Sequence, residues 1–318
     1  MPSIKVDSIG ERALSETLKL LFNLNQFYPQ YSGSFHRTLP PILNILHCLT
    51  LDSEPLLQPM NYLINALLNI EFSSAQTREQ DEGGSPSNLL FPKEDFSSHT
   101  TRLVQVLEVS IDSYSEDALE STAVPLITLL RRVNEIAPGQ VQKKLREQLL
   151  PSDAERDQPL GKSNTLASKL LKLSTAPAAT QVKEGISSLL FELSDKDPAT
   201  FVRNVGYGYA AGYLTTHQTS TPSGMDDVGA RVTNVDGREI NPVTGQRRDM
   251  EPPDPSSNMS DEEKEREAER LFVLFERLRA TGVMNVTNPV EQAVREGRLE
   301  EVQSDESEHE DEDTRKSS

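Results

Sequence analysis

Apolar residues recur every three or four positions along most of the chain as far as Leu214. This spacing places them on one face of an α-helix and so predicts amphipathic helices. No window alternates apolar and polar residues with period two, so we expect no sheet. Pro125 should begin a helix, because proline is tolerated best in a first turn. The predicted helices are Ser8–Leu24, Pro40–Leu51, Pro59–Ile70, Phe96–Asp112, Asp117–Ile136, Gln140–Leu149, Leu166–Leu173 and Ala178–Leu193.

Two of these helices carry similar segments. The segments 20–24 and 62–66 align with Asn23 over Asn65. Their separation is typical of armadillo or HEAT repeats, in which helix pairs stack into a solenoid. We therefore predict an all-α, armadillo/HEAT-like α-solenoid over residues 1–214, interrupted by a polar surface loop at 73–95. The first helix begins near Met1 without a capping repeat, so we expect a missing cap or the C-terminal part of a longer protein.

The pattern changes at Phe201–Leu214, FVRNVGYGYAAGYL. Its three glycines predict a helix end followed by a tight turn that closes the solenoid, because glycine adopts the left-handed backbone that ends helices. Residues 215–259 are rich in turn residues and predict a flexible linker that contains the segment INPVTG (240–245).

One amphipathic helix is predicted beyond the linker, over residues 260–281. Ser260 and Glu263 have the spacing of a capping box, and acidic residues follow where the helix dipole favours them. The helix then carries an apolar stripe of Leu271, Phe272, Leu274, Phe275 and Leu278. This stripe must be buried, either by packing back onto the solenoid or by binding a partner. Residues 282–318 predict a disordered acidic tail.

Charge narrows the choice of partner. The whole chain carries a net charge of −18, and the segment Asp249–Ser318 holds 21 acidic against 9 basic side chains, a net −12. Nucleic acid and anionic membranes would be repelled, so a basic protein surface suits this region better. No apolar run has the length of a membrane span and no secretory signal is present, so we expect a cytoplasmic monomer without direct membrane insertion.

Residues for catalysis or metal binding are not arranged in recognisable motifs. The single cysteine, Cys48, excludes a disulfide framework and a cysteine-based zinc site, and the five histidines show no metal-binding spacing. There is no GxSxG, P-loop or complete GxGxxG motif, and the clustered carboxylates lie in solvated runs. We expect no enzyme activity, no cofactor and no metal.

Polar residues on the apolar helices are better candidates for binding. Asn23, Asn61 and Asn65 lie on helices where asparagine is a poor helix former, and Lys19 occupies the repeat position that corresponds to Asn61. Such side chains can hydrogen-bond a peptide in the groove of a solenoid, but caps or local bonds would explain the asparagines equally well. Arg131 and its neighbour Arg132 follow an apolar run and could meet a carboxylate.

Several blocks together resemble the synembryn family, the cytosolic exchange factors and folding chaperones of heterotrimeric G-protein α subunits. The blocks, in the family's order, are LKLLFNL (18–24), LREQLLP (145–151), LLFELSDKDPATFVRNVGYG (189–208), INPVTG (240–245) and MSDEEKEREAERLFVLFERL (259–278). The resemblance covers nearly the whole chain and is closest to fungal members. The chain lacks the N-terminal repeats of the family.

The resemblance implies a superhelix whose concave face grips the C-terminal helix of a G-protein α subunit. The segment after the solenoid would reach the nucleotide domain. The partner would be the nucleotide-free or GDP-bound α subunit, with the nucleotide-free state bound best. Carried over by motif, Phe22 and Asn23 lie on a groove-lining helix, Asn61 and Asn65 on the next repeat, and Leu271–Leu278 on the distal helix. The partner would also recruit the chain from the cytoplasm to the cell cortex.

The chain departs from the family in three places. The acidic, phosphorylatable stretch before INPVTG is reduced to SGMDDVG, and Tyr209 stands where the family has asparagine. Acid-directed phosphorylation is instead predicted at Ser260 and Ser307. The missing repeats would remove part of the groove. The alternative function is a non-catalytic α-solenoid scaffold that binds an unrelated protein.

Overall fold

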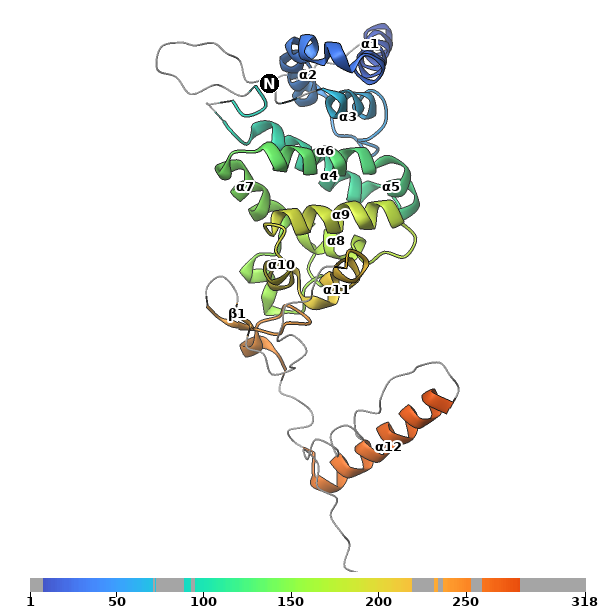
Figure 1. The fold of residues 1–318 in the computed structure, drawn as a ribbon, viewed down its shortest axis with the longest axis vertical. Coiled ribbons are helices and arrows are strands. Elements are labelled where there is room, and N and C mark those ends of the chain that lie inside the picture. Colours follow the sequence, from blue (N-terminus) through green and yellow to red (C-terminus); the bar gives the residue numbers. More distant parts are fainter. Residues whose placement is uncertain are drawn as a thin grey trace, which may run out of the picture. The chain divides into compact units, whose positions relative to one another are not determined.

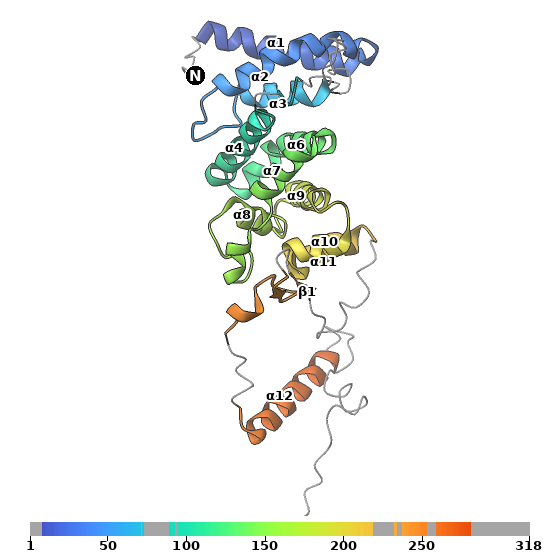
Figure 2. The same cartoon turned by 90° about the vertical axis from the view of Figure 1, so that its left-hand side faces the viewer.

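Helices alternate between two layers along most of the chain (Figures 1 and 2). The computed structural model describes residues 8–70, 72, 89–92, 95–218, 232–233, 237–252 and 259–280. They fall into two units, Met1–Glu251 and Pro252–Ser318, and each is described by itself.

The first layer of the larger unit is a ladder of five helices that pack one on the next. These are α1 (Ser8–Phe27), α3 (Met60–Asn69), α6 (Val124–Ile136), α9 (Thr180–Leu193) and α11 (Tyr207–Thr216). The second layer is built in the same way from α2 (Leu39–Cys48), α4 (Ser98–Ser113), α7 (Gly139–Leu149) and α8 (Leu166–Leu173). Helices of each layer pack on the next repeat, and α2 with α3, α6 with α7 and α8 with α9 pack across the layers, so the armadillo/HEAT-like solenoid is confirmed.

The shorter elements connect these layers. They are the 3-10 helices η1 (Pro29–Thr38) and η3 (Asp153–Asp157), and the helices α5 (Glu116–Thr122) and α10 (Pro198–Val205). The core runs through the whole stack, and its fully buried side chains include Leu39, Leu63, Leu130, Leu149 and Val205. Each helix buries a stripe and not its whole surface, as expected of amphipathic helices.

Two arginines join successive repeats by binding helix ends. Arg102 on α4 donates to the carbonyls of Leu46, at 3.2 Å, and Leu49, at the end of α2. Arg132 on α6 makes the same kind of contact with the end of α3 and lies 4.8 Å from the ring centroid of Phe72. The last carbonyls of a helix have no partner within it, so these guanidinium groups satisfy acceptors that packing would otherwise bury unpaired.

The glycine segment differs from its prediction. α10 ends at Gly206 as expected, where φ is +82°, but the chain then continues as α11 over Tyr207–Thr216. A single left-handed residue is therefore a corner between two helices, and the expectation of a terminal turn was wrong. The expected loop 73–95 is also shorter at its end, because Leu90 and Phe91 are buried in the core.

INPVTG lies folded against the solenoid and not in an open linker. The strands β1 (Val232–Thr233) and β2 (Glu239–Ile240) form a two-residue antiparallel pair, the one departure from the predicted lack of a sheet among the described residues. The 3-10 helix η4 (Arg248–Met250) follows. The larger unit ends at Glu251, well beyond the boundary that we expected after Leu214.

The smaller unit contains α12 (Asp261–Ala280). The predicted capping box is confirmed, since the Glu263 N–H donates to Ser260 Oγ at 3.3 Å and the Ser260 N–H donates to Glu263 Oε2 at 3.1 Å. The predicted tail, 282–318, lies outside the described residues. None of the helices in the described part of the chain has the length and apolar content needed to cross a bilayer.

Candidate binding pocket on the first helical layer

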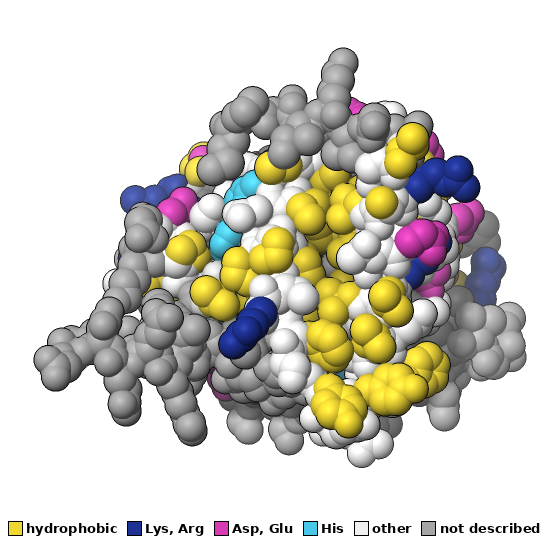
Figure 3. Space-filling view, turned by 90° about the horizontal axis from the view of Figure 1, so that it is seen from above, with side chains coloured by type: hydrophobic (Ala, Val, Ile, Leu, Met, Phe, Trp, Pro, Cys, Tyr) yellow, Lys and Arg dark blue, Asp and Glu magenta, His cyan; other side chains and the backbone are white. Residues whose placement is uncertain are grey.

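A pocket of about 340 Å³ lies between α1 and α3, at one end of the solenoid. Its lining residues are Leu18, Lys19, Phe22, Asn23, Tyr62 and Asn65. Seen from the end of the molecule that carries α1, hydrophobic side chains gather over much of the surface (Figure 3). An apolar pocket with a few polar groups is the usual form of a binding site in a protein surface.

Helical spacing explains how these residues meet. Phe22 and Asn23 follow Lys19 by three and four positions on α1, and Tyr62 and Asn65 are three apart on α3, so each set lies on one side of its helix. The two helices pack against each other and turn these faces to a common space. The alignment of Asn23 with Asn65 in the sequence thus corresponds to a pair of neighbouring helices in the first layer.

Lys19 gives the pocket a positive group that is already oriented. Its Nζ lies 2.8 Å from Glu16 Oε1 and 4.7 Å from the centroid of the Tyr62 ring. The hydrogen bond with Glu16 raises the pKa of Lys19 above its ordinary value, so the ammonium form is favoured. The ammonium group of Lys19, held over the ring of Tyr62, lies where it can meet an anionic group of a ligand.

The asparagines have different environments. Asn65 donates from Nδ2 to the carbonyl of Asn61 at 2.8 Å, whereas Asn23 is exposed and its amide bonds to none of the described residues. Asn61 accepts from the N–H of Tyr62 at 2.7 Å and is not part of the pocket lining. Asn61 and Asn65 therefore both make the local bonds that were the alternative explanation, and Asn23 and Asn65 lie at the pocket.

Arg131 lies elsewhere in the first layer. Its guanidinium donates to Glu192 Oε1 at 2.7 Å and joins α6 to α9, and this hydrogen bond raises the pKa of Arg131. The carboxylate that we expected Arg131 to meet is thus supplied by a neighbouring helix of the same chain. Tyr62 was not among the predicted site residues, although it aligns with Leu20, the residue after Lys19 on α1.

The distal helix presents exposed apolar side chains within its own unit. Leu271 is 47% exposed and Phe272 is 42% exposed. The side chains of Phe275 and Leu278, as well as Ser307, lie outside the described residues. Ser260 is the N-cap of α12, and its role as a phosphorylation site stays a prediction.

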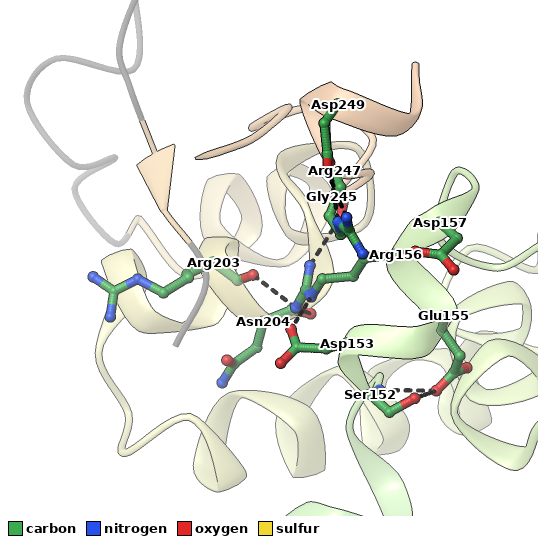
Figure 4. A network of polar contacts seen from close by, with 10 residues as sticks. All are labelled: Ser152, Asp153, Glu155, Arg156, Asp157, Arg203, Asn204, Gly245, Arg247 and Asp249. Carbon is green, nitrogen blue, oxygen red and sulfur yellow. Dashed lines mark hydrogen bonds and ion pairs between the residues drawn. The ribbon is translucent and has the colours of Figure 1, made fainter. Parts of the chain in front are cut away.

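A second cluster, unforeseen in the sequence, is centred on Arg156 in η3 (Figure 4). Its side chain is nearly buried, and its guanidinium donates to the carbonyls of Gly245, Arg203 and Asn204 at 3.0 to 3.1 Å. Burial lowers the pKa of Arg156, and the carboxylate of Asp153 opposes this effect. One arginine thus ties the end of α10 to the INPVTG segment.

Neighbouring groups extend this tie. Arg247 donates its backbone N–H to the Arg156 carbonyl at 2.8 Å and pairs through its guanidinium with Asp157 and Asp249. The buried Gln246 donates to the carbonyls of Asp157 and Met250 at 3.1 Å. Among the described residues, no group of three or more potential metal ligands occurs in either cluster or elsewhere.

The chain is similar in sequence to known proteins. A family model described as guanine nucleotide exchange factor synembryn matches residues 3–298. A synembryn-like chaperone of Schizosaccharomyces pombe is 32% identical over 215 residues, which are 64% of this chain and 40% of that protein. The chaperone Ric-8A of Xenopus tropicalis is 28% identical over 289 residues, 83% of this chain and 50% of that protein.

The chain spans about half the length, or less, of these relatives. The match to the family model, in contrast, extends over nearly the whole chain, from the first helix of the solenoid to beyond α12. The chain therefore belongs to the guanine nucleotide exchange factor synembryn family.

Proposed function

We propose that this chain is a guanine nucleotide exchange factor and folding chaperone for heterotrimeric G-protein α subunits. Its first helical layer grips the C-terminal helix of the α subunit, and the pocket between α1 and α3 receives part of that helix. The observation that carries the proposal is the match to the synembryn family over residues 3–298. The gathering of Lys19, Phe22, Asn23 and Asn65 in one pocket supports the location.

The pocket has the groups that a short helical peptide needs. Phe22 and Leu18 offer an apolar surface, Lys19 an ammonium group, and Asn23 and Asn65 amides that can bond peptide groups. Helix-in-groove recognition uses such apolar anchors on one face, with polar contacts that fix orientation.

Exchange follows from a difference in affinity between two states of the partner. Holding the C-terminal helix away from the GTPase domain loosens the nucleotide pocket, so the exchange factor binds the nucleotide-free state more tightly than the loaded state. By linkage, the same difference in affinity promotes nucleotide release. Newly made α subunits are held in the same way until GTP binds, which is the chaperone role.

The deciding experiment is a pull-down of purified α subunit in the nucleotide-free, GDP and GTP-analogue states, with nucleotide release measured in parallel. An exchange factor must retain the nucleotide-free form best and accelerate release. Equal retention in all three states without acceleration contradicts the proposal and favours the passive scaffold.

Two substitutions test the pocket. Replacing Asn23 and Asn65 together by Ala should weaken binding of a peptide from the C-terminus of the partner about tenfold, because each lost hydrogen bond contributes roughly 0.5–1.5 kcal/mol. Asn44→Ala is the matched control, since Asn44 is exposed on α2 in the second layer. Unchanged affinity in the double variant would remove both asparagines from the site.

A further inference from the structure

Residues 239–251, here named the clasp, bind the solenoid at the corner between α10 and α11. The N–H of Tyr207 donates to the Pro242 carbonyl at 2.7 Å, and the N–H of Gly208 donates to the Val243 carbonyl at 3.0 Å. These are first-turn groups of α11, which have no acceptor within their own helix. The clasp therefore supplies the N-terminal cap that the sequence of α11 lacks.

Close packing fixes the position of the clasp. The N–H of Leu160 donates to the Thr244 carbonyl at 3.0 Å, and Arg156 holds the next carbonyl, that of Gly245. Gly245 has φ +67°, and a Cβ there would collide with the Leu160 side chain. Glycine suits both demands, because other residues rarely adopt this φ and a Cβ would have to displace the Leu160 side chain.

The turn inside the clasp is also self-supported. Asn241 Oδ1 accepts from the N–H of Val243 at 2.9 Å, and Asn241 Nδ2 donates to Glu251 Oε1 at 2.6 Å. The second bond reaches the last residue of the larger unit. The clasp thus determines the point at which the chain leaves the solenoid on its way to α12.

The point at which the chain leaves the solenoid determines the length of the tether, which is the chain between the larger unit and α12. Between Glu251 and the start of α12 at Asp261 lie 9 residues, which span at most about 30 Å when fully extended. If the clasp were released, the last anchored residue would be His217, after the end of α11. The tether would then be 43 residues long and could extend to about 150 Å.

We propose that the clasp is a positioning device that raises the effective concentration of α12 around a partner held by the first helical layer. The inference rests on the proposed function, together with the contact between the region after the solenoid and the same α subunit that the family resemblance implies. Effective concentration falls roughly as the −3/2 power of tether length, so lengthening from 9 to 43 residues lowers it about tenfold. Arg156, Asn241 and Gly245 are then positioning residues.

The test uses the full chain and four variants. Gly245→Val disrupts the packing of the clasp on Leu160, and Asn241→Ala removes hydrogen bonds within the clasp. Neither substitution changes a residue of the helices. Val243→Ala is the matched control, because the Val243 side chain is exposed and only its carbonyl binds α11. Insertion of 34 Gly/Ser residues after Pro252 leaves the clasp intact but gives a tether of the same length as the released chain.

Affinity is measured for the whole nucleotide-free α subunit and for its C-terminal peptide. We expect Gly245→Val, Asn241→Ala and the insertion each to weaken binding of the whole subunit about tenfold, with peptide affinity unchanged. Combining Gly245→Val with the insertion should weaken binding of the whole subunit only two- to threefold more than either change alone, because both lengthen the same tether. If the clasp had a purely structural role, the variants would also lose affinity for the peptide, or the effects of Gly245→Val and the insertion on affinity would multiply.

Spin-label distances test the device without any partner. Labels at Glu108→Cys on α4 and Glu269→Cys on α12, in a Cys48→Ser background, should give a broader distance distribution in Gly245→Val than in Val243→Ala. An unchanged distribution, or a loss of affinity with the insertion but not with Gly245→Val, overturns the inference. Failure of the peptide to bind contradicts the proposed function instead, and the spin-label comparison then still decides the clasp.

Discussion

Glu155 shows how one residue can hold a connection between helices. Its carboxylate accepts hydrogen bonds from the Ser152 N–H at 2.8 Å, from the Ser163 hydroxyl at 3.1 Å and from Thr165. Burial alone would raise the pKa of Glu155, but these bonds outweigh it, so the pKa lies below its ordinary value. The charged carboxylate therefore stabilises the segment that leads from η3 into α8.

Glu155→Gln should lower the free energy of unfolding by about 1–3 kcal/mol, because an amide cannot accept all of these bonds at once. The stabilisation by Glu155 is complete above the ordinary carboxyl pKa and is lost as pH falls through the lowered pKa of the folded state. In urea unfolding at decreasing pH, the free energy of unfolding of the variant should therefore fall less than that of the parent chain. Glu147→Gln is the control, since its carboxylate is exposed and makes only a 3.8 Å contact with Lys144.

The packing of α2 against α4 includes a pair of histidines. His47 Nε2 lies 2.8 Å from His99 Nδ1, and one ring donates while the other accepts. Burial, followed by the proximity of His47, lowers the pKa of His99 to about 4, and Asp95 opposes this shift. Burial and Arg102 also lower the pKa of His47. Both rings are therefore neutral at neutral pH, and the hydrogen bond needs only that the accepting nitrogen carries no proton.

This pair predicts a loss of stability in mild acid. The unfolded chain takes up protons near the ordinary histidine pKa of 6.5, whereas folded His99 takes one up only near 4, so stability falls across this interval as pH is lowered. His99→Gln keeps a hydrogen-bonding group but does not titrate. It should flatten the pH dependence of the free energy of unfolding between pH 6.5 and 4, measured by urea unfolding at each pH, by an amount on the order of 1–2 kcal/mol after allowance for partial exposure. A slope equal to that of the parent chain would contradict this account, and His217→Gln is the control for an exposed histidine.

At the scale of the whole molecule, the larger unit closes on itself through the clasp and not at the end of the last solenoid helix. Ile240 and Gln246 are buried, and the buried Arg156 donates to the Gly245 carbonyl of the clasp. Truncation after Glu251 removes the smaller unit without cutting these contacts, whereas truncation after His217 removes all of them.

A chain ending at Glu251 should therefore melt at the temperature of the full chain. A chain ending at His217 should melt roughly 5–10 °C lower, because it loses the cap of α11 and uncovers Arg156 and apolar surface worth a few kcal/mol. Calorimetry of the two truncations makes the comparison. Equal melting temperatures would show that the clasp adds nothing to the stability of the unit.

The sequence by itself determined the helices and the class of fold. Leu166–Leu173 was predicted at both ends, and Thr165 caps it by accepting from the Ser168 N–H at 3.2 Å. Pro125 lies in the first turn of α6, and Ser260 caps α12, as expected. These features succeed because periodicity and capping depend on residues three or four positions apart, which the sequence displays directly.

Only the tertiary structure decided which distant groups meet. Arg156 and Gly245 are 89 residues apart, Arg131 and Glu192 are 61 apart, and neither spacing carries a periodic signal. INPVTG has the composition of a loop, and its fixed conformation comes from carbonyls that satisfy the unpaired N–H groups of α11. The clasp and the pocket between α1 and α3 exist because stacking brings separate helices together, and the energy of those contacts appears only once the stack has formed.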